Sequence, residues 1–186
     1  MPQNRSSSRV ELMIAGLGGM GVVVAGRVLA SAGLREYKYA SFVPSYGSER
    51  RGGLSECTVV LSDGVIASPI LNRVQSVILL DSSQIRSFEN RVHSGGLIIA
   101  EQASLKEEPH RGDITLLAVS GLEIALGVGG MIFNNLVLLG VYTEVVKPVP
   151  HQLVEEELKI RYRDDLLRSN LEAFRKGLEL GKSAHG

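Results

Sequence analysis

The chain has 186 residues, of which 44% are hydrophobic and 22% are charged, values that are typical of one globular domain and exclude a disordered chain. Lys plus Arg and Asp plus Glu each count 20, so the formal net charge is zero. A neutral chain lacks the basic surplus of a nucleic-acid-binding protein, and its low charge favours association with other subunits.

The first half of the chain alternates apolar runs with glycine-rich turns. After a polar tail over residues 1–8, we predict a strand over 9–15, a helix over 22–33 and a second strand over 37–43, which Pro44 would end. Residues 54–61 alternate in polarity as a strand does, and the following Asp63-Gly64 signals an antiparallel hairpin near residues 54–70.

The second half predicts further strands and helices in alternation. The expected strands cover 74–80, 97–100 and 114–119. The expected helices cover 84–92, after an Asp81-Ser82-Ser83 cap, then residue 121 onward until Pro148 and Pro150, and finally 164–181. This order predicts an α/β fold: a single layered domain over residues 9–181 with a mostly parallel sheet, followed by a short C-terminal tail, 182–186.

Two apolar stretches have some features of membrane signals. Residues 12–26 follow two arginines, as a signal peptide would, and residues 124–142 carry no charge over 19 positions. Glycines interrupt both, and Asn134-Asn135 lie inside the second, where hydrocarbon would penalise them. We expect both to be buried segments of a cytoplasmic protein without a membrane span.

The single cysteine, Cys57, limits the chemistry of the chain. One thiol cannot form an internal disulfide, hold an iron–sulfur cluster or build a structural zinc site. The four histidines are scattered, so we predict no metal site, and we expect Cys57 to be a small buried residue.

Four glycines follow the first predicted strand, at Gly16, Gly18, Gly19 and Gly21. They match G-x-G-x-x-G between a strand and a helix, where backbone N–H groups can approach a phosphate. A dinucleotide site would also place an acid at the end of the second strand, but that end reads Ser41-Phe42-Val43-Pro44. Nucleotide binding, close packing of helix on strand and contact with another subunit all remain open.

The loop that follows carries the densest polar chemistry of the sequence. Its candidate residues are Ser45, Tyr46, Gly47, Glu49, Arg50, Arg51, Gly52 and Gly53. The loop would emerge at the carboxyl end of the second strand, beside the glycine run, where ligands of α/β sheets gather. Its two arginines could hold phosphate or carboxylate groups. A solvated turn with an Arg–Glu pair, or a loop held against a neighbouring subunit, would explain the same residues.

A second pair of motifs is weaker. Gly112-Asp113 followed by Asn134-Asn135 resembles faintly the motif that holds magnesium and thiamine diphosphate, but Ile114 stands where a third glycine is expected. Adjacent amides beside an apolar helical run more often cap or cross-link the backbone. We therefore treat Asn134 and Asn135 as supporting residues of the candidate site, and we predict no catalytic residue in this chain.

Together these residues resemble the gamma subunit (or gamma domain) of 2-oxoacid:ferredoxin oxidoreductases, the group that acts on pyruvate, 2-oxoglutarate, 2-ketoisovalerate or indolepyruvate. The resemblance runs from about residue 9 to 181, and its most specific part is the loop over 44–53 behind the glycine run. Met20, Ser48 and Arg50 depart from the family pattern, which commonly has glutamine, proline and an apolar residue there.

The resemblance implies a multi-subunit enzyme that oxidatively decarboxylates a 2-oxoacid to an acyl-coenzyme A. Thiamine diphosphate and magnesium are expected between alpha and beta subunits, and [4Fe-4S] clusters in beta or in a ferredoxin-like delta subunit. Ferredoxin or an NAD-linked acceptor would take the electrons. This chain would bind none of these cofactors alone; it would pack on alpha and help bind the co-substrate coenzyme A, with Arg50 and Arg51 facing its phosphates.

Two other functions fit the same residues. The first is a stand-alone α/β module that binds an adenine nucleotide without a redox role. The second is a purely structural scaffold subunit.

Overall fold

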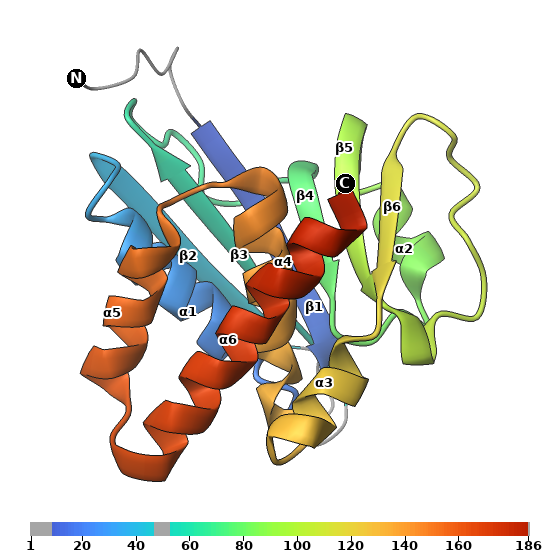
Figure 1. The fold of residues 1–186 in the computed structure, drawn as a ribbon. Coiled ribbons are helices and arrows are strands. Elements are labelled where there is room, and N and C mark those ends of the chain that lie inside the picture. The colour runs from blue at the N-terminus through green and yellow to red at the C-terminus, as the bar shows by residue number, and fades with distance from the viewer. Residues whose placement is uncertain (1–8, 47–52, 186) are drawn as a thin grey trace.

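The computed structural model describes residues 9–46 and 53–185, and in these ranges six strands form one sheet with helices on both faces (Figure 1). The strands are β1 (Arg9–Leu17), β2 (Tyr39–Tyr46), β3 (Leu54–Ser62), β4 (Val74–Leu79), β5 (Val92–Glu101) and β6 (Thr115–Val119). The helices are α1 (Val22–Gly33), α2 (Ile85–Glu89), α3 (Gly121–Val128), α4 (Asn134–Val146), α5 (His151–Arg161) and α6 (Asp164–His185), with short 3₁₀ turns η1 (Gln102–Ser104) and η2 (Met131–Phe133).

The strand order is β2-β3-β1-β4-β5-β6. Strands β1, β4, β5 and β6 run parallel, whereas β3 pairs antiparallel with both β1 and β2. The predicted fold class, an α/β domain with a mostly parallel sheet and an antiparallel hairpin, is confirmed.

The position of the hairpin was predicted wrongly. The hairpin joins β2 to β3, and no strand follows Asp63-Gly64 before β4. Both edges of β3 are already occupied, by β2 on one side and β1 on the other, so residues after 64 have no open edge of β3 to pair with.

The helices are unevenly divided between the two faces of the sheet. Helices α1, α4, α5 and α6 cover one face, and α2 lies on the other (Figure 1). The larger core lies under the first group and includes Leu12, Ile14, Leu61 and Phe174. The smaller core, around Met13, lies under α2. Each parallel strand near the centre is therefore buried on both faces, as its continuous apolar sequence requires.

Helices α4 and α6 pack with their backbones in contact. A Cβ atom on Gly177 would lie 2.1 Å from the carbonyl oxygen of Val137, and one on Gly140 would lie 2.3 Å from that of Phe174. Both positions therefore require glycine, and the long final helix is pressed directly against α4.

Several element boundaries differ from the predictions. Strand β2 continues through Pro44 to Tyr46, because it is the edge strand, where a proline can sit with its nitrogen facing away from the partner strand. Helix α2 covers only 85–89, and Asp81 accepts a hydrogen bond from the Ser83 backbone N–H (3.0 Å) in a local turn rather than capping that helix.

The helical region after residue 121 is divided, and the last helix is longer than predicted. Gly129 and Gly130 both have positive φ angles and separate α3 from η2 and α4. Helix α6 extends to His185, so residues 182–185 are helical where a tail was expected. No helix among the described residues is long and apolar enough to cross a membrane.

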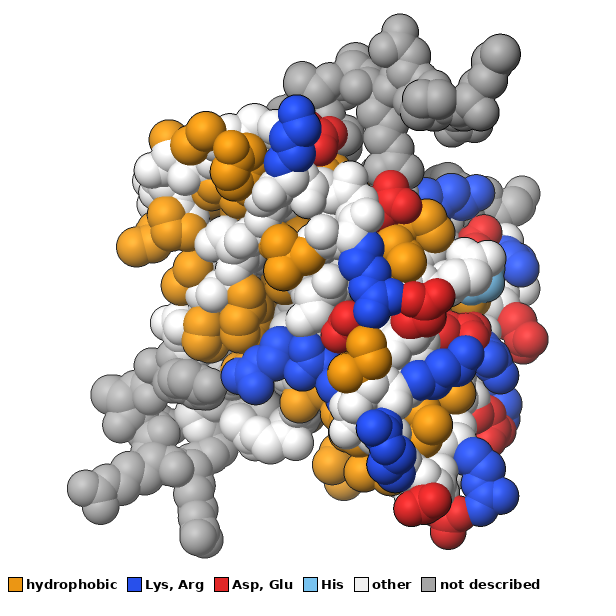
Figure 2. Space-filling model, turned by 90° about the vertical axis from the view of Figure 1, so that its left-hand side faces the viewer, with side chains coloured by type: hydrophobic (Ala, Val, Ile, Leu, Met, Phe, Trp, Pro, Cys, Tyr) orange, Lys and Arg blue, Asp and Glu red, His pale blue; other side chains and the backbone are white. Residues whose placement is uncertain are grey.

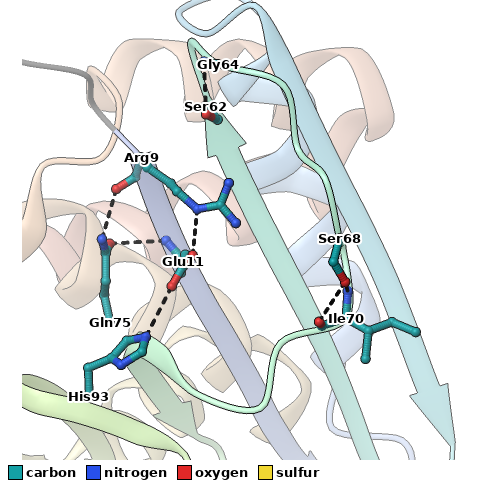
Figure 3. A network of polar contacts seen from close by, with 8 residues as sticks. All are labelled: Arg9, Glu11, Ser62, Gly64, Ser68, Ile70, Gln75 and His93. Carbon is teal, nitrogen blue, oxygen red and sulfur yellow. Dashed lines mark hydrogen bonds and ion pairs between the residues drawn. The ribbon is translucent and has the colours of Figure 1, made fainter.

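A polar cluster ties the amino ends of three strands together at the edge of the sheet opposite the glycine run (Figure 3). The buried Glu11 carboxylate on β1 forms an ion pair with Arg9 (2.6 Å), and Nε2 of His93 on β5 lies 3.5 Å from it. Gln75 on β4 accepts from the Glu11 N–H (3.2 Å) and donates to the Arg9 carbonyl (3.1 Å). These contacts fix the register at the start of the sheet.

Candidate functional site

The carboxyl ends of the parallel strands β1, β4 and β5 meet at one edge of the sheet. The glycine run follows β1 at this edge, as it does in α/β ligand sites. Gly18 and Gly19 are exposed there and line two neighbouring cavities of about 420 and 550 Å³. A Cβ atom on Gly19 would meet nothing within 4 Å, so this part of the backbone is open to a ligand or a partner.

The other glycines of the run serve close packing. Gly21 precedes α1 with a left-handed φ of 79°, and a Cβ there would lie 2.4 Å from Nδ2 of Asn135. That amide donates a hydrogen bond to the Gly21 carbonyl (3.1 Å). A Cβ on Gly16 would lie 3.0 Å from that of Leu80. The run therefore combines two packing positions with two open ones, and Asn135 supports it directly.

The structure brings the tyrosine–arginine loop next to the glycine run at its described ends. The Gly18 N–H donates to the Gly53 carbonyl (2.9 Å). Ser45 is exposed at the end of β2, and the Tyr46 backbone pairs with Ser55 of β3. The candidate residues Gly47, Glu49, Arg50, Arg51 and Gly52 lie outside the described residues, as does Ser48.

Glu101 is a residue of this edge that the sequence analysis missed. It ends β5, is only 2% exposed, and accepts hydrogen bonds at Oε2 from the Leu122 N–H (2.9 Å) and Asn134 Nδ2 (3.1 Å). Its Oε1 accepts from the Ala103 N–H (3.1 Å). Three donors thus stabilise a buried carboxylate that joins β5 to the first turns of α3 and α4. The feature of the sequence that could have indicated this residue is an acid directly after the apolar run 97–100.

The larger cavity combines acids with an apolar wall. Asp81, Glu101 and Ser104 supply its polar groups, and the apolar lining includes Leu122 and Ile132. A ribose-binding acid is expected at the end of the second strand, but β2 lies at the edge of the sheet and does not neighbour β1. In the folded sheet, β4 lies next to β1 instead, and Asp81 follows β4. An acid therefore does lie beside the glycine run, but it follows the fourth strand of the chain and not the second.

The smaller cavity continues into a groove along α1. Its wall is mainly apolar, with Val23, Val24 and Tyr162 shared between the cavity and a neighbouring hollow of about 300 Å³. That hollow also includes Arg27 and Arg161. The Arg27 guanidinium lies 5.8 Å from the centre of the Phe42 ring, and Arg161 donates to Ser31 Oγ (2.8 Å) and pairs with Glu157 (3.7 Å). The groove thus runs from open glycine backbone to two cations.

Cys57 has the structural role predicted for it. Its side chain is buried, and a Cβ on Gly26 of α1 would lie 2.4 Å from its Sγ. Burial raises the pKa of the thiol to about 12, so it is protonated at neutral pH and is no nucleophile. Among the described residues, no group of three or more His, Cys, Asp and Glu side chains is placed to hold a metal ion.

The weak thiamine motif has local roles in the structure. Asp113 forms a two-bond pair with the Arg111 guanidinium (2.9 and 2.7 Å), which lowers the pKa of the carboxyl to about 2. Its carbonyl accepts from the Gly95 N–H (2.7 Å). Asp113 therefore fastens the loop before β6, while Asn134 binds Glu101.

Residues 11–180 match the family model described as pyruvate ferredoxin/flavodoxin oxidoreductase. The chain belongs to this family. Ketoisovalerate oxidoreductase subunit VorA of Methanothermobacter thermautotrophicus is 30% identical over 173 residues, which are 91% of this chain and 36% of VorA. The chain thus spans about a third of that relative. 2-Oxoglutarate synthase subunit KorC of Methanocaldococcus jannaschii is 28% identical, with coverage of 98% of this chain and 99% of KorC.

Solved structures agree with this assignment. The gamma subunit of a keto/oxoacid ferredoxin oxidoreductase from Geobacter sulfurreducens superposes with a TM-score of 0.81 at 25% identity and covers 95% of this chain and 98% of its own. 2-Oxoglutarate:ferredoxin oxidoreductase from Magnetococcus marinus, solved with 2-oxoglutarate, coenzyme A and succinyl-CoA bound, matches with a TM-score of 0.85 at 19% identity, over 94% of this chain and 31% of that chain. The predicted resemblance to gamma subunits is confirmed.

Proposed function

We propose that this chain is the gamma subunit of a multi-subunit 2-oxoacid:acceptor oxidoreductase. The complex would oxidatively decarboxylate a 2-oxoacid to an acyl-coenzyme A in the cytoplasm and reduce ferredoxin or an NAD-linked acceptor. The observation that carries the proposal is the family match over residues 11–180, together with relatives such as KorC that this chain covers from end to end.

The cofactors would belong to the companion subunits. Alpha and beta would hold thiamine diphosphate with magnesium, and beta or a ferredoxin-like delta subunit would hold the [4Fe-4S] clusters. Two observations support this division. The one thiol of this chain is buried and protonated, which does not suit a ligand of an iron–sulfur cluster, and Asp113 of the weak thiamine motif is paired with Arg111. The choice of 2-oxoacid would then lie in the companion subunits.

We assign to this chain a place on the coenzyme A path, at its boundary with alpha. Coenzyme A is long, with a thiol arm at one end and phosphates at the other. The groove along α1 offers an apolar wall at Val23 and Val24 between open glycine backbone and the cations Arg27 and Arg161. Guanidinium groups bind phosphates well. The larger cavity is lined by the acids Asp81 and Glu101, whereas the lining of the smaller cavity contains no acid, so the smaller cavity is the better candidate for coenzyme A.

The test measures coenzyme A dependence in the assembled complex. The double variant R50A/R51A and the variant R27A should each raise the apparent KM for coenzyme A several-fold. The reduction of the complex by 2-oxoacid without coenzyme A should stay unchanged. Arg168, on the exposed surface of α6 beside Asp165, offers the control R168A. Unchanged coenzyme A dependence in assembled variants would refute the binding role and leave a structural one.

One observation favours a second function, a stand-alone module that binds an adenine nucleotide. Asp81 at the end of β4, beside the open Gly18 and Gly19, is placed as a ribose-binding acid would be. This function predicts that the isolated chain gains thermal stability with a nucleotide, since a ligand that binds only the folded state stabilises it. The melting temperature measured with and without ATP, ADP or NAD separates the two functions.

A further inference from the structure

The larger cavity lies at the switch point of the sheet, between β1 and β4. From β1 the chain places β2 and β3 on one side and β4, β5 and β6 on the other. Ligands of open α/β sheets bind at the carboxyl ends of the strands beside such a point. Gly19 after β1, Asp81 after β4 and Glu101 at the end of β5 line this cavity, whose volume of about 550 Å³ suits a small ligand. Coenzyme A is assigned to the smaller cavity, so the proposed function leaves this one without an occupant.

The two acids of the larger cavity have no cation beside them. Asp81 is half-buried; its Oδ1 accepts from the N–H (3.0 Å) and the hydroxyl of Ser83, whereas its Oδ2 has no partner among the described residues. Glu101 is buried and accepts only from uncharged N–H donors. The described residues that line the cavity include no Lys, Arg or His. The cavity therefore carries negative charge that no neighbouring cation neutralises.

Other acids with little exposure differ from these two. They form ion pairs with arginines at 2.6–2.7 Å, in the pairs Glu11–Arg9, Glu56–Arg91 and Glu155–Arg175. Figure 2 shows the same habit on the half that bears the helices, where Lys and Arg side chains lie among those of Asp and Glu. Buried charges in proteins are normally paired, because an unpaired charge is costly to remove from water. A cation in the larger cavity would supply the missing partner.

The other polar side chains of the cavity also lack a donor. Asn134 is only 7% exposed, and its Nδ2 donates to Glu101, but its buried Oδ1 has no partner among the described residues. The Ser104 hydroxyl is already engaged, since it accepts from the Ser82 N–H (2.8 Å) and donates to the Glu101 carbonyl (3.4 Å). A buried acceptor without a donor costs free energy. The ligand that suits these walls therefore brings hydrogen-bond donors.

Apolar side chains form the remaining walls. Leu80 and Leu122 line the cavity together with Met131 and Ile132 of η2. Met131 is 66% exposed and Ile132 is 63% exposed, so these two lie at its rim. An apolar stem fits such walls, and methionine adapts its shape to different stems. The cavity thus combines an apolar passage with acceptors of negative charge.

We propose that the larger cavity binds an organic cation, in which an apolar stem ends in an ammonium or guanidinium group that pairs with Asp81. Lysine and arginine side chains have this chemistry, with a stem that packs on apolar surface and a cationic head. The acids disfavour 2-oxoacids and the phosphates of coenzyme A, which are anions. A metal ion is disfavoured too, because no group of three or more ligating side chains gathers among the described residues. The inference goes beyond the proposed function and does not depend on it.

The test is an NMR titration of the full ¹⁵N-labelled chain at pH 7. The probe is pentylamine, which has the stem length of a lysine side chain and is protonated at this pH, since such ammonium groups have a pKa of about 10.4. Pentan-1-ol keeps the stem without the charge, and pentanoate reverses the charge. The test variant is D81N, which removes the charge and keeps the shape. The control is D63N, which follows β3 at the opposite end of the sheet, where Ser62 pairs with Arg9.

Pentylammonium should shift the amide signals of Gly19 and Ala103 and bind at least about tenfold more tightly than pentan-1-ol, because charge-assisted hydrogen bonds are the stronger ones. Pentanoate should give no saturable shift. Folded D81N should lose the preference for ammonium, and D63N should keep it. The three probes on the unaltered chain decide the question even where D81N does not fold.

Four results would overturn the cation site. They are equal binding of amine and alcohol, an unchanged preference in folded D81N, an equal loss of preference in D63N, and adenosine that binds at the same amides more tightly than pentylammonium. The last result would favour the adenine-nucleotide function. None of the four would change the assignment of the chain to its family.

A last probe identifies the source of the cation, which is a free amine or a protein side chain. N-acetyl-lysine methylamide carries the same stem and ammonium group between two peptide groups. Binding as tight as that of pentylammonium would support the cation site and assign it to a lysine of a partner protein. Binding of pentylammonium alone would support the site and assign it to a free amine.

Discussion

Gly21 couples the glycine run to Asn135, and its replacement by alanine tests the packing of the site. Gly21 has a φ of 79°, where an alanine costs about 1–2 kcal/mol. The added Cβ would lie 2.4 Å from Asn135 Nδ2, so that amide must move and give up its hydrogen bond to the Gly21 carbonyl, at about 0.5–1.5 kcal/mol. We expect Gly21→Ala to lower the free energy of unfolding by the sum of these costs, about 1.5–3.5 kcal/mol.

Gly19→Ala is the matched control. Gly19 also has a positive φ, 96°, but a Cβ there meets nothing within 4 Å. Its cost should therefore be limited to the backbone strain of about 1–2 kcal/mol. Both variants are measured by urea unfolding followed by circular dichroism. In the double variant Gly21→Ala/Asn135→Ala the steric conflict is gone, so the combined loss should fall below the sum of the two single losses.

Two results would refute this reasoning. One is a Gly21→Ala variant no less stable than Gly19→Ala. The other is a double variant whose loss equals the sum of its parts, which would show that Gly21 and Asn135 are not in contact.

Four further predictions follow from the structure. Glu101→Gln should lower the free energy of unfolding by about 1–3 kcal/mol, because an amide N–H would face one of the three donors; urea unfolding checks this, and an unchanged midpoint would contradict it. Cys57 should resist alkylation at pH 8 in the folded chain and react in denaturant, since burial raises its pKa to about 12; rapid labelling of the folded chain, followed by mass spectrometry, would contradict this. The Asp113 carboxyl has a pKa lowered to about 2, chiefly by Arg111 and also by a hydrogen bond with Ser94, so its stabilising contribution is present above about pH 4 and is lost as the pH falls toward 2; in Arg111→Ala an NMR titration should find the pKa raised toward its usual value, and a pKa that stays near 2 would exclude Arg111 as the main cause. Gly177→Ala should destabilise more than any of these, since its Cβ would meet the Val137 backbone at 2.1 Å; a melting temperature within a few degrees of the original would show that α4 and α6 can separate at little cost.

The sequence predicted the strands and the first helix because apolar periodicity and glycine are local signals. It also predicted that the glycine run and the loop behind it would be neighbours, and the bond from Gly18 to Gly53 places them so. The insertion of β3 between β1 and β2 was not predictable in the same way. Strand order depends on long-range pairing, which leaves no trace in the periodicity of one segment.

The remaining misses have similar causes. Helix α5 was not predicted, because it follows Pro148 and Pro150 directly and buries few residues, among them Val154 and Leu158. The sequence around Asp81 predicts a helix cap, whereas its place beside the glycine run depends on the order of the strands, which puts β4 next to β1. The role of Glu101 is not recognisable from the sequence, because two of its three donors, Leu122 and Asn134, belong to segments that are distant in sequence.

The central claim is that this chain works as the gamma subunit of a 2-oxoacid oxidoreductase. The most direct test is a mild affinity purification of the chain from its native cells, with mass spectrometry and an absorption spectrum. The claim predicts companion subunits that carry thiamine diphosphate, brown iron–sulfur absorbance, and acceptor reduction that requires a 2-oxoacid and coenzyme A. A colourless chain that purifies alone and gains thermal stability with an adenine nucleotide would contradict it.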